Sequence, residues 1–158
     1  MSERDCTHFT YRTPHGRITL AANGEAITSL AFGNAPLEGT PRPSELTTRA
    51  STEVLEYFAG KRTAFDVPLA PAGSPFQHAV WKAACAIPYG QTRTFSEIAC
   101  LIGEPDAYRS VGAACRRNPL PILVPTHRIV GAKGAPTGTG HAAETQRFLL
   151  ALEQQHRA

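Results

Sequence analysis

The chain has 158 residues, of which 42% are hydrophobic and 18% are charged. This length suits one domain, or one domain with a small appendage, and the composition excludes long disorder. No run of about 18 apolar residues is present to cross a membrane, and the polar N-terminus lacks the apolar core of a signal peptide. The four cysteines form no Cys-x-x-Cys pair, so we expect reduced thiols in the cytoplasm, no metal site and no cofactor.

In chain order, residues 1–70 predict a small α/β unit. Two β-like segments, Phe9–Thr13 and Arg17–Ala22, flank a turn, and Ile27–Phe32 predicts a third strand. Residues 33–43 are rich in Pro, Gly and Thr and predict a loop.

A helix is predicted next, capped by Ser44 and ended by Gly60. The apolar positions of its buried face are Leu46, Ala50, Val54, Leu55 and Phe58. A further short strand is predicted at Phe65–Val67. Residues 68–74 contain three prolines or glycines and form the best linker.

Beyond the linker the pattern becomes helical. Ser74 as N-cap, Pro75 at the first helical position and Gln77 in a capping box predict a helix start. The segment Pro88–Gly90 ends this helix. Its buried stripe is predicted at Phe76, Ala79, Val80, Ala83, Ala84 and Ile87.

Two short helices follow, joined by a glycine-containing turn. The first opens with a capping box of Thr94 and Glu97. The second is predicted from about Ala107 to Arg117, with Asp106 as its cap. Such a pair predicts a helix-turn-helix.

The second of these helices has two distinct faces. The side chains that should pack inward are Val111, Ala114 and Cys115. The opposite face consists of arginines and very small residues: Arg109, Ala113 and Arg116, flanked by Gly112 and Arg117. A face of this kind lets the backbone approach a nucleic acid closely, or lets another helix pack there.

Charge is unevenly distributed along the chain. Residues 1–73 carry 7 basic and 8 acidic side chains, whereas residues 74–158 carry 9 basic and 5 acidic ones. Between Ala107 and Ala143 there are five basic side chains and no acidic one. A surface that faces a polyanion is one interpretation, and an ordinary solvated basic face is the other.

The most informative segment is Ile122–Val130, in which an apolar strand is expected to lead into Pro-Thr-His-Arg. Around it, motifs occur in the order Phe76-Gln77, Val80-Trp81, Ile87–Gly90, Thr94-Phe95, Ile98-Ala99, Ile102-Gly103, Arg109, Val111-Gly112, Asn118-Pro119, Pro125, His127-Arg128, Gly134, Leu149-Leu150 and Glu153. In these motifs the chain resembles the O6-alkylguanine-DNA alkyltransferases, densely over residues 74–155 and loosely before them.

The resemblance implies a chemistry, and the chain departs from it at one residue. The family's pattern is Pro-Cys-His-Arg, whose cysteine accepts the alkyl group from guanine O6 once. A glutamate orients the histidine, which activates the cysteine through a water. His127 and Glu153 match that pair, and Asn118 matches the asparagine that links the helix-turn-helix to the reactive strand. Thr126 stands at the acceptor position.

This departure matters because the two nucleophiles differ. A thiol has a pKa of about 8.5 and gives a soft thiolate, whereas a threonine hydroxyl is far less acidic and is a poorer nucleophile. The β-branch of threonine also adds a methyl group to a pocket that must admit a base. We therefore expect alkyl transfer to be lost or severely weakened.

The resemblance also implies contacts with DNA. Arg109 matches the arginine that fills the gap left by a rotated-out nucleotide, and Phe95 stands where the family often has a tyrosine that meets a phosphate. A core position for Phe95 is the alternative. The expected DNA contacts are Phe95, Ser96, Arg109, Gly112, Ala113, Arg116, Arg117 and Arg128. The expected base pocket is Pro125, Thr139, Gly140 and His141, without the tyrosine that many members carry there.

We therefore expect an α+β protein, with a small N-terminal α/β unit at residues 1–70 and a winged-helix-like domain with a helix-turn-helix at residues 74–158. Its expected function lies in DNA repair: a cytoplasmic or nucleoid-associated monomer that binds double-stranded DNA and recognises O6-alkylguanine by base flipping without accepting the alkyl group. Other repair proteins are its expected partners, and no membrane is expected. Alkyl transfer to a different acceptor and transcription regulation through the helix-turn-helix are the alternatives. His127 and Glu153 could also serve only as a buried staple.

Overall fold

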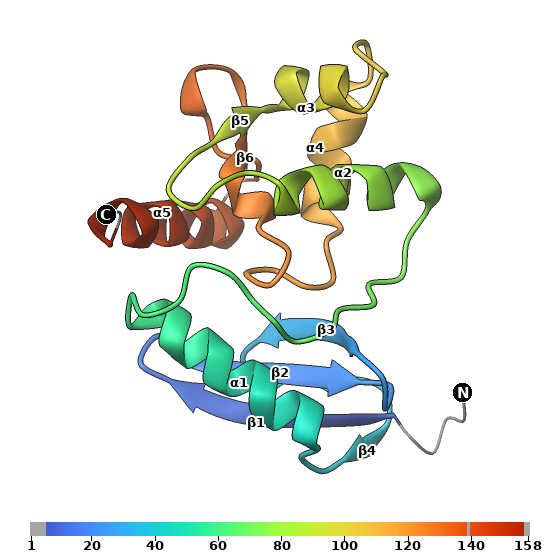
Figure 1. Cartoon of the computed structure of the whole chain (residues 1–158), viewed down its shortest axis with the longest axis vertical. Coiled ribbons are helices and arrows are strands. Elements are labelled where there is room, and N and C mark those ends of the chain that lie inside the picture. Colours follow the sequence, from blue (N-terminus) through green and yellow to red (C-terminus); the bar gives the residue numbers. More distant parts are fainter. Residues whose placement is uncertain (1–5, 139, 157–158) are drawn as a thin grey trace. The chain divides into compact units, whose positions relative to one another are not determined.

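The chain divides after Ala72 into two compact units, residues 1–72 and 73–158. The computed structural model describes residues 6–138 and 140–156 (Figure 1). Among these residues, no helix is both long and apolar enough to cross a membrane.

The first unit is built on a four-stranded sheet in the order β3-β2-β1-β4. Strands β1 (Thr7–Thr13), β2 (Gly16–Ala22) and β3 (Ile27–Phe32) form an antiparallel meander, as predicted. The hairpin turn between β1 and β2 uses Gly16 at φ 107°, a conformation that favours glycine. The short β4 (Thr40–Pro41) pairs parallel with β1 and lies inside the segment that was predicted as a loop.

Helix α1 (Glu45–Phe58) packs against one face of this sheet (Figure 1). Ser44 caps it, as predicted, and shares a capping box with Thr47. Leu55 was predicted to face inward but is 39% exposed, whereas Tyr57 is fully buried. The reason is that position 55 lies about 100° around the helix from the buried Val54.

The second unit contains α2 (Pro75–Cys85), β5 (Arg93–Thr94), α3 (Phe95–Leu101), α4 (Tyr108–Arg116), β6 (Ile129–Val130) and α5 (Gly140–Gln155). Strands β5 and β6 pair parallel in a two-stranded sheet. Both predicted capping boxes are present, at Ser74 and at Thr94. Trp81 on α2 donates from Nε1 to the carbonyl of Ala114 on α4 at 2.9 Å. The two units together confirm the predicted α+β fold.

Two further local predictions in this fold are wrong. Asp106 does not cap α4: the N-cap is Ala107, which makes no side-chain capping bond. Residues Phe65–Val67 do not form a strand. Instead, Leu69 makes an isolated bridge with Ile27.

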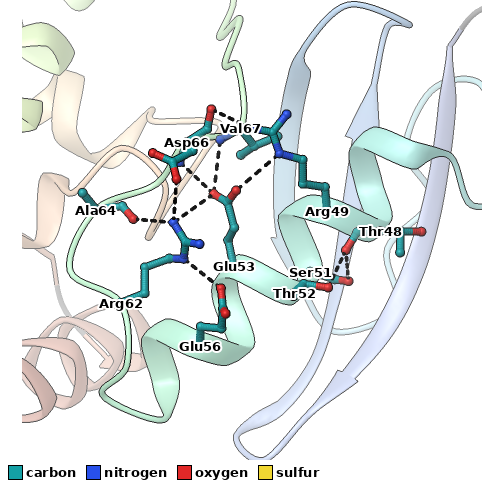
Figure 2. Close-up of polar contacts among 10 residues, drawn as sticks. All are labelled: Thr48, Arg49, Ser51, Thr52, Glu53, Glu56, Arg62, Ala64, Asp66 and Val67. Atoms are coloured by element: carbon teal, nitrogen blue, oxygen red, sulfur yellow. Dashed lines mark hydrogen bonds and ion pairs between the residues drawn. The ribbon is translucent and has the colours of Figure 1, made fainter.

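The segment around residue 66 is held by a buried carboxylate instead of by a sheet. Glu53 on α1 is 4% exposed, and its Oε1 accepts from the backbone N–H groups of Asp66 (2.9 Å) and Val67 (3.2 Å). Arg49 and Arg62 approach the same carboxylate at 3.5 and 3.9 Å (Figure 2). These bonds satisfy the two backbone donors that a β-ladder would otherwise have used.

We predict that Glu53→Gln lowers the free energy of unfolding by about 1–3 kcal/mol, because the neutral amide loses charge-assisted bonds in a buried place. Glu56→Gln is the matched control. Glu56 also pairs with an arginine, Arg62 at 2.9 Å, but its side chain is 43% exposed, so the loss should be below about 1 kcal/mol. Urea unfolding followed by circular dichroism measures both. Equal losses for the two variants would contradict the assignment of Glu53 as the anchor.

Candidate functional site

Helices α3 and α4 pack together and leave one face of α4 exposed. Ile98 and Ala99 on α3 are buried, and so are the three inward residues predicted for α4. On the exposed face of α4, Arg109, Arg116 and Arg117 are exposed and Ala113 is half-buried. Ser96 is exposed on α3. The structure therefore brings these predicted DNA contacts together on the helix pair.

Gly112 is not part of that exposed face. It is buried, and a Cβ placed on it would meet the Phe95 ring at 3.4 Å and the Arg116 guanidinium at 3.5 Å. Gly112 therefore packs under the aromatic ring and the arginine, and its contact with DNA stays a prediction. Phe95 itself is half-buried, and it packs on Gly112.

The segment before the Pro-Thr-His-Arg motif is a turn, not the predicted strand. Ile122 has φ 75°, a region that β-branched residues rarely adopt. Pro125 has φ −80° and ψ 60°, and Thr126 N donates to the carbonyl of Val124 at 2.8 Å, which makes an inverse γ-turn. Residues Thr126–Arg128 then form a 3₁₀ turn (η2) that leads into β6. We call residues 124–128 the reactive turn.

Asn118 holds this turn from the end of α4. Its Nδ2 donates to the carbonyl of Val124 at 2.9 Å and to Oγ1 of Thr126 at 3.0 Å. Its Oδ1 accepts from the backbone N–H of Leu120 at 2.9 Å. Thr126 is 8% exposed. The hydroxyl therefore occupies a fixed position in a nearly closed site.

A buried ionic cluster lies directly after Thr126. Glu153 on α5 is fully buried, and its Oε2 lies 2.6 Å from Nε2 of His127. Arg128 donates to the same carboxylate from Nε at 2.9 Å and from Nη2 at 3.0 Å. The backbone N–H of Gly90 donates to Oε1 at 3.0 Å. The predicted pairing of His127 with Glu153 is thus present in the geometry.

Arg128 was predicted as a DNA contact, and this prediction is wrong. Arg128 is 5% exposed. Besides its two hydrogen bonds to Glu153, its guanidinium donates from Nη1 to the carbonyl of Ile87 at 2.9 Å. Its guanidinium also lies over the Tyr89 ring, 5.5 Å from the centroid. A guanidinium bound in this way cannot reach a phosphate.

Burial decides the protonation of His127. Desolvation lowers the pKa of the imidazole, because a charged ring would lose its hydration, and the Glu153 carboxylate opposes this shift. The ring is therefore held neutral and can accept a proton, which a general base requires.

Two of the three cysteines of the second unit are poorly prepared as nucleophiles. Burial raises the pKa of Cys115 to about 12, and it also raises the pKa of Cys85 against the nearby Arg128 charge. Cys100 is exposed on α3. A thiol with a raised pKa supplies little thiolate at neutral pH.

The predicted base pocket is placed only in part. Pro125 is buried within the reactive turn. Gly140, at φ 59°, and His141 form the exposed start of α5. Thr139 lies outside the described residues.

Sequence reasoning missed Gln146, a buried side chain on α5. Its amide donates to the carbonyls of His127 (3.1 Å) and Ile129 (3.0 Å). A signal was available, because Gln146 lies seven residues before Glu153 and so on the same face of one helix. In the described parts of the chain, no group of three or more His, Cys, Asp or Glu side chains is placed to hold a metal ion.

Comparisons with known proteins agree in both units. The family described as "6-O-methylguanine DNA methyltransferase, DNA binding domain" matches residues 75–155, and its "ribonuclease-like domain" matches residues 7–71. A methylated-DNA–protein-cysteine methyltransferase of Methanosarcina barkeri is 42% identical over 153 residues, which cover 91% of this chain and 94% of that protein.

Solved structures are similar over nearly the full length. The crystal structure of Mycobacterium tuberculosis O6-methylguanine methyltransferase superposes with a TM-score of 0.88 at 41% identity, covering 97% of this chain and 95% of that one. The M. tuberculosis OGT in complex with DNA gives a TM-score of 0.87 at 42% identity, with 95% and 94% covered.

We predict that the second unit loses stability as the pH falls below about 6.5, the pKa of an unperturbed histidine. The pKa of His127 is lowered in the fold. Below about pH 6.5, position 127 therefore binds a proton in the unfolded chain but not in the folded chain. The stabilisation is therefore complete above that pH and is lost on acidification. Urea unfolding followed by the fluorescence of Trp81, the single tryptophan, should show a smaller pH dependence for His127→Gln. Parallel pH profiles for the two proteins would disprove this role.

Proposed function

Because this chain belongs to the 6-O-methylguanine DNA methyltransferase family, we propose that it binds duplex DNA at an O6-alkylguanine and holds the rotated-out base without accepting the alkyl group. Removing a base from the stack costs a few kcal/mol, and it costs less when the base pairs poorly. O6-alkylation weakens pairing, so the lesion itself favours the rotated-out state.

One observation carries this proposal: the hydroxyl of Thr126 stands where the resemblance places the acceptor. Asn118 holds that hydroxyl at 3.0 Å, and the next residue, His127, is paired with Glu153 at 2.6 Å. A neutral imidazole cannot bring a threonine hydroxyl close to ionisation at neutral pH, because the two pKa values lie too far apart. The site thus has the paired His127 and Glu153 and the asparagine that positions residue 126, but it has a hydroxyl where the resemblance places a thiol.

The exposed face of α4 supports binding to DNA. Arg109 and Arg116 lie on it, Arg117 follows as the C-cap residue, and no acidic side chain occurs between residues 107 and 143. Arg109 lies beside the exposed Tyr108, with its guanidinium 5.9 Å from the ring centroid. In this proposal Arg109 fills the gap left by the rotated-out nucleotide, while Arg116 and Arg117 contact phosphates.

Two other functions are weaker fits. Alkyl transfer to another acceptor would need a reactive thiol, and burial raises the pKa values of Cys85 and Cys115. A transcription regulator would need only the helix pair, so the link from Asn118 to Thr126 would have no purpose in DNA binding. A protein that binds a lesion without repairing it must be followed by proteins that do repair it. The proposal therefore implies a monomer whose partners are other repair proteins.

We predict that the protein gains no methyl group from DNA containing O6-methylguanine, and that Thr126→Cys does. A thiol at this position would have its pKa lowered by the neighbouring imidazole, which can take its proton. The measurement is the intact mass of each protein, followed by peptide mapping. Thr126→Ser is the matched control, because it removes the β-methyl group but keeps a hydroxyl, and it should stay unmodified. Methylation of the parent at Thr126 or at a native cysteine would overturn the inactive assignment.

We also predict that the parent binds an O6-methylguanine duplex more tightly than the same duplex with guanine, because the poorly paired base leaves the stack at lower cost. Arg109→Ala should narrow this difference, since the gap in the stack is no longer filled. Fluorescence anisotropy at a fixed salt concentration measures both affinities. Equal affinities of the parent for the two duplexes would leave plain DNA binding as the function.

A further inference from the structure

The side-chain amide of Gln146 accepts a hydrogen bond through its oxygen and donates hydrogen bonds through its nitrogen, all within the second unit. The residue is 6% exposed. Its Oε1 accepts from the backbone N–H of Thr137 at 2.6 Å. Its Nε2 lies within 3.1 Å of three acceptors: the carbonyls of His127 and Ile129 and Oγ1 of Thr137. The side chain therefore joins the segment around Thr137 to the reactive turn.

Thr137 is held from three sides. Besides the bond from its N–H to Gln146, its hydroxyl donates to the carbonyl of Ile129 at 2.8 Å. Its carbonyl accepts from Nη1 of Arg116 at 3.2 Å. Arg116 lies on the exposed face of α4, so a continuous series of hydrogen bonds runs from that face through Thr137 and Gln146 to the carbonyl of His127.

Only an amide fits the position of Gln146. The backbone N–H of Thr137 requires an acceptor, while the carbonyls of His127 and Ile129 require donors. A glutamate would set a negative charge against two carbonyl oxygens, and an apolar side chain would leave all three backbone groups without this partner. A buried side chain with such specific bonding fixes a geometry as well as filling space.

We propose that Gln146 is a positioning residue, which sets the reactive turn relative to the DNA-facing helix α4. This inference rests on the proposed function, because it assigns Gln146 a part in recognising the lesion. The site that must receive a rotated-out base is formed at Thr126 and His127, whereas DNA is met at Arg116. Gln146 and Thr137 connect the two places, so lesion recognition depends on them while general DNA binding does not.

The test compares two duplexes of the same sequence that carry either O6-methylguanine or guanine at one position. For Gln146→Glu, we expect the affinity for the lesion duplex to fall by about fivefold to tenfold, the equivalent of losing one buried hydrogen bond. We expect the affinity for the guanine duplex to stay as in the parent. Gln155→Glu, at the exposed end of α5, is the matched control for the added charge and should leave both affinities unchanged.

A second variant keeps the test decisive if Gln146→Glu folds poorly. Thr137→Val keeps Gln146 and the Thr137 backbone but removes the hydroxyl bonds to Ile129 and Gln146, and it should lower the lesion affinity in the same direction. In the Thr126→Cys protein, adding Gln146→Glu should slow methyl transfer at saturating DNA, whereas a purely structural role would change only the thermal unfolding temperature.

The outcomes separate this inference from the proposed function. A parent with equal affinities for the two duplexes defeats both. A parent that prefers the lesion, with Gln146→Glu and Thr137→Val retaining the full preference, overturns the role of Gln146 alone. Equal losses of affinity for both duplexes would also overturn it, because they would indicate general damage to the fold.

Discussion

The carboxylate of Glu153 on α5 accepts hydrogen bonds from two other parts of the second unit. One is the loop after α2, through the backbone N–H of Gly90, and the other is the reactive turn, through the imidazole of His127 and the guanidinium of Arg128. A buried charge is costly unless it is paired and hydrogen-bonded, and removing one partner leaves the other charge unpaired. Glu153 and Arg128 therefore depend on each other. Together they fix α5, the reactive turn and the loop after α2 in one arrangement.

The buried cluster of His127, Arg128 and Glu153 can have two roles, one in proton transfer and one in stability. The same bond that would orient His127 for proton transfer also secures α5 to the rest of the unit. A chain that had lost its nucleophile would still need Glu153 to neutralise the buried Arg128. The persistence of His127 and Glu153 is thus no argument for alkyl transfer by itself. In the proposed function, the chemistry depends on the atom at position 126.

The sequence was informative wherever local rules decide the structure. The capping boxes at Ser74 and Thr94 and the inward stripe of α4 depend on neighbours within one or two helical turns, and they were predicted correctly. The partners of Arg128 could not be predicted, because Ile87 and Glu153 lie 41 and 25 residues away in the chain. Basic side chains look alike in a sequence, and only the fold tells a buried arginine from an exposed one.

The failed strands have a related cause. The apolar run before Pro125 has the composition of a buried strand, but the bonds from Asn118 impose a turn on it. Phe65–Val67 also has strand composition, yet its backbone donors are taken by Glu53 on α1. In both places a polar side chain from outside the segment supplies hydrogen bonds that a neighbouring strand would have made. β-propensity records only that a residue suits a pleated surface, so it cannot foresee such competition.

The hydroxyl of Thr126 makes a stronger hydrogen bond at position 126 than a thiol would. The oxygen of Thr126 accepts a full hydrogen bond from Asn118, whereas sulfur is a weak acceptor. A threonine therefore ties the reactive turn to the end of α4 more firmly than a cysteine would, while it gives up the thiolate. For a protein that must bind a damaged base and remain unaltered, a well-held turn is an advantage and a reactive sulfur is not required. The same exchange would disable a protein that must accept the alkyl group, so in the proposed function the residue at this single position separates lesion binding from alkyl transfer.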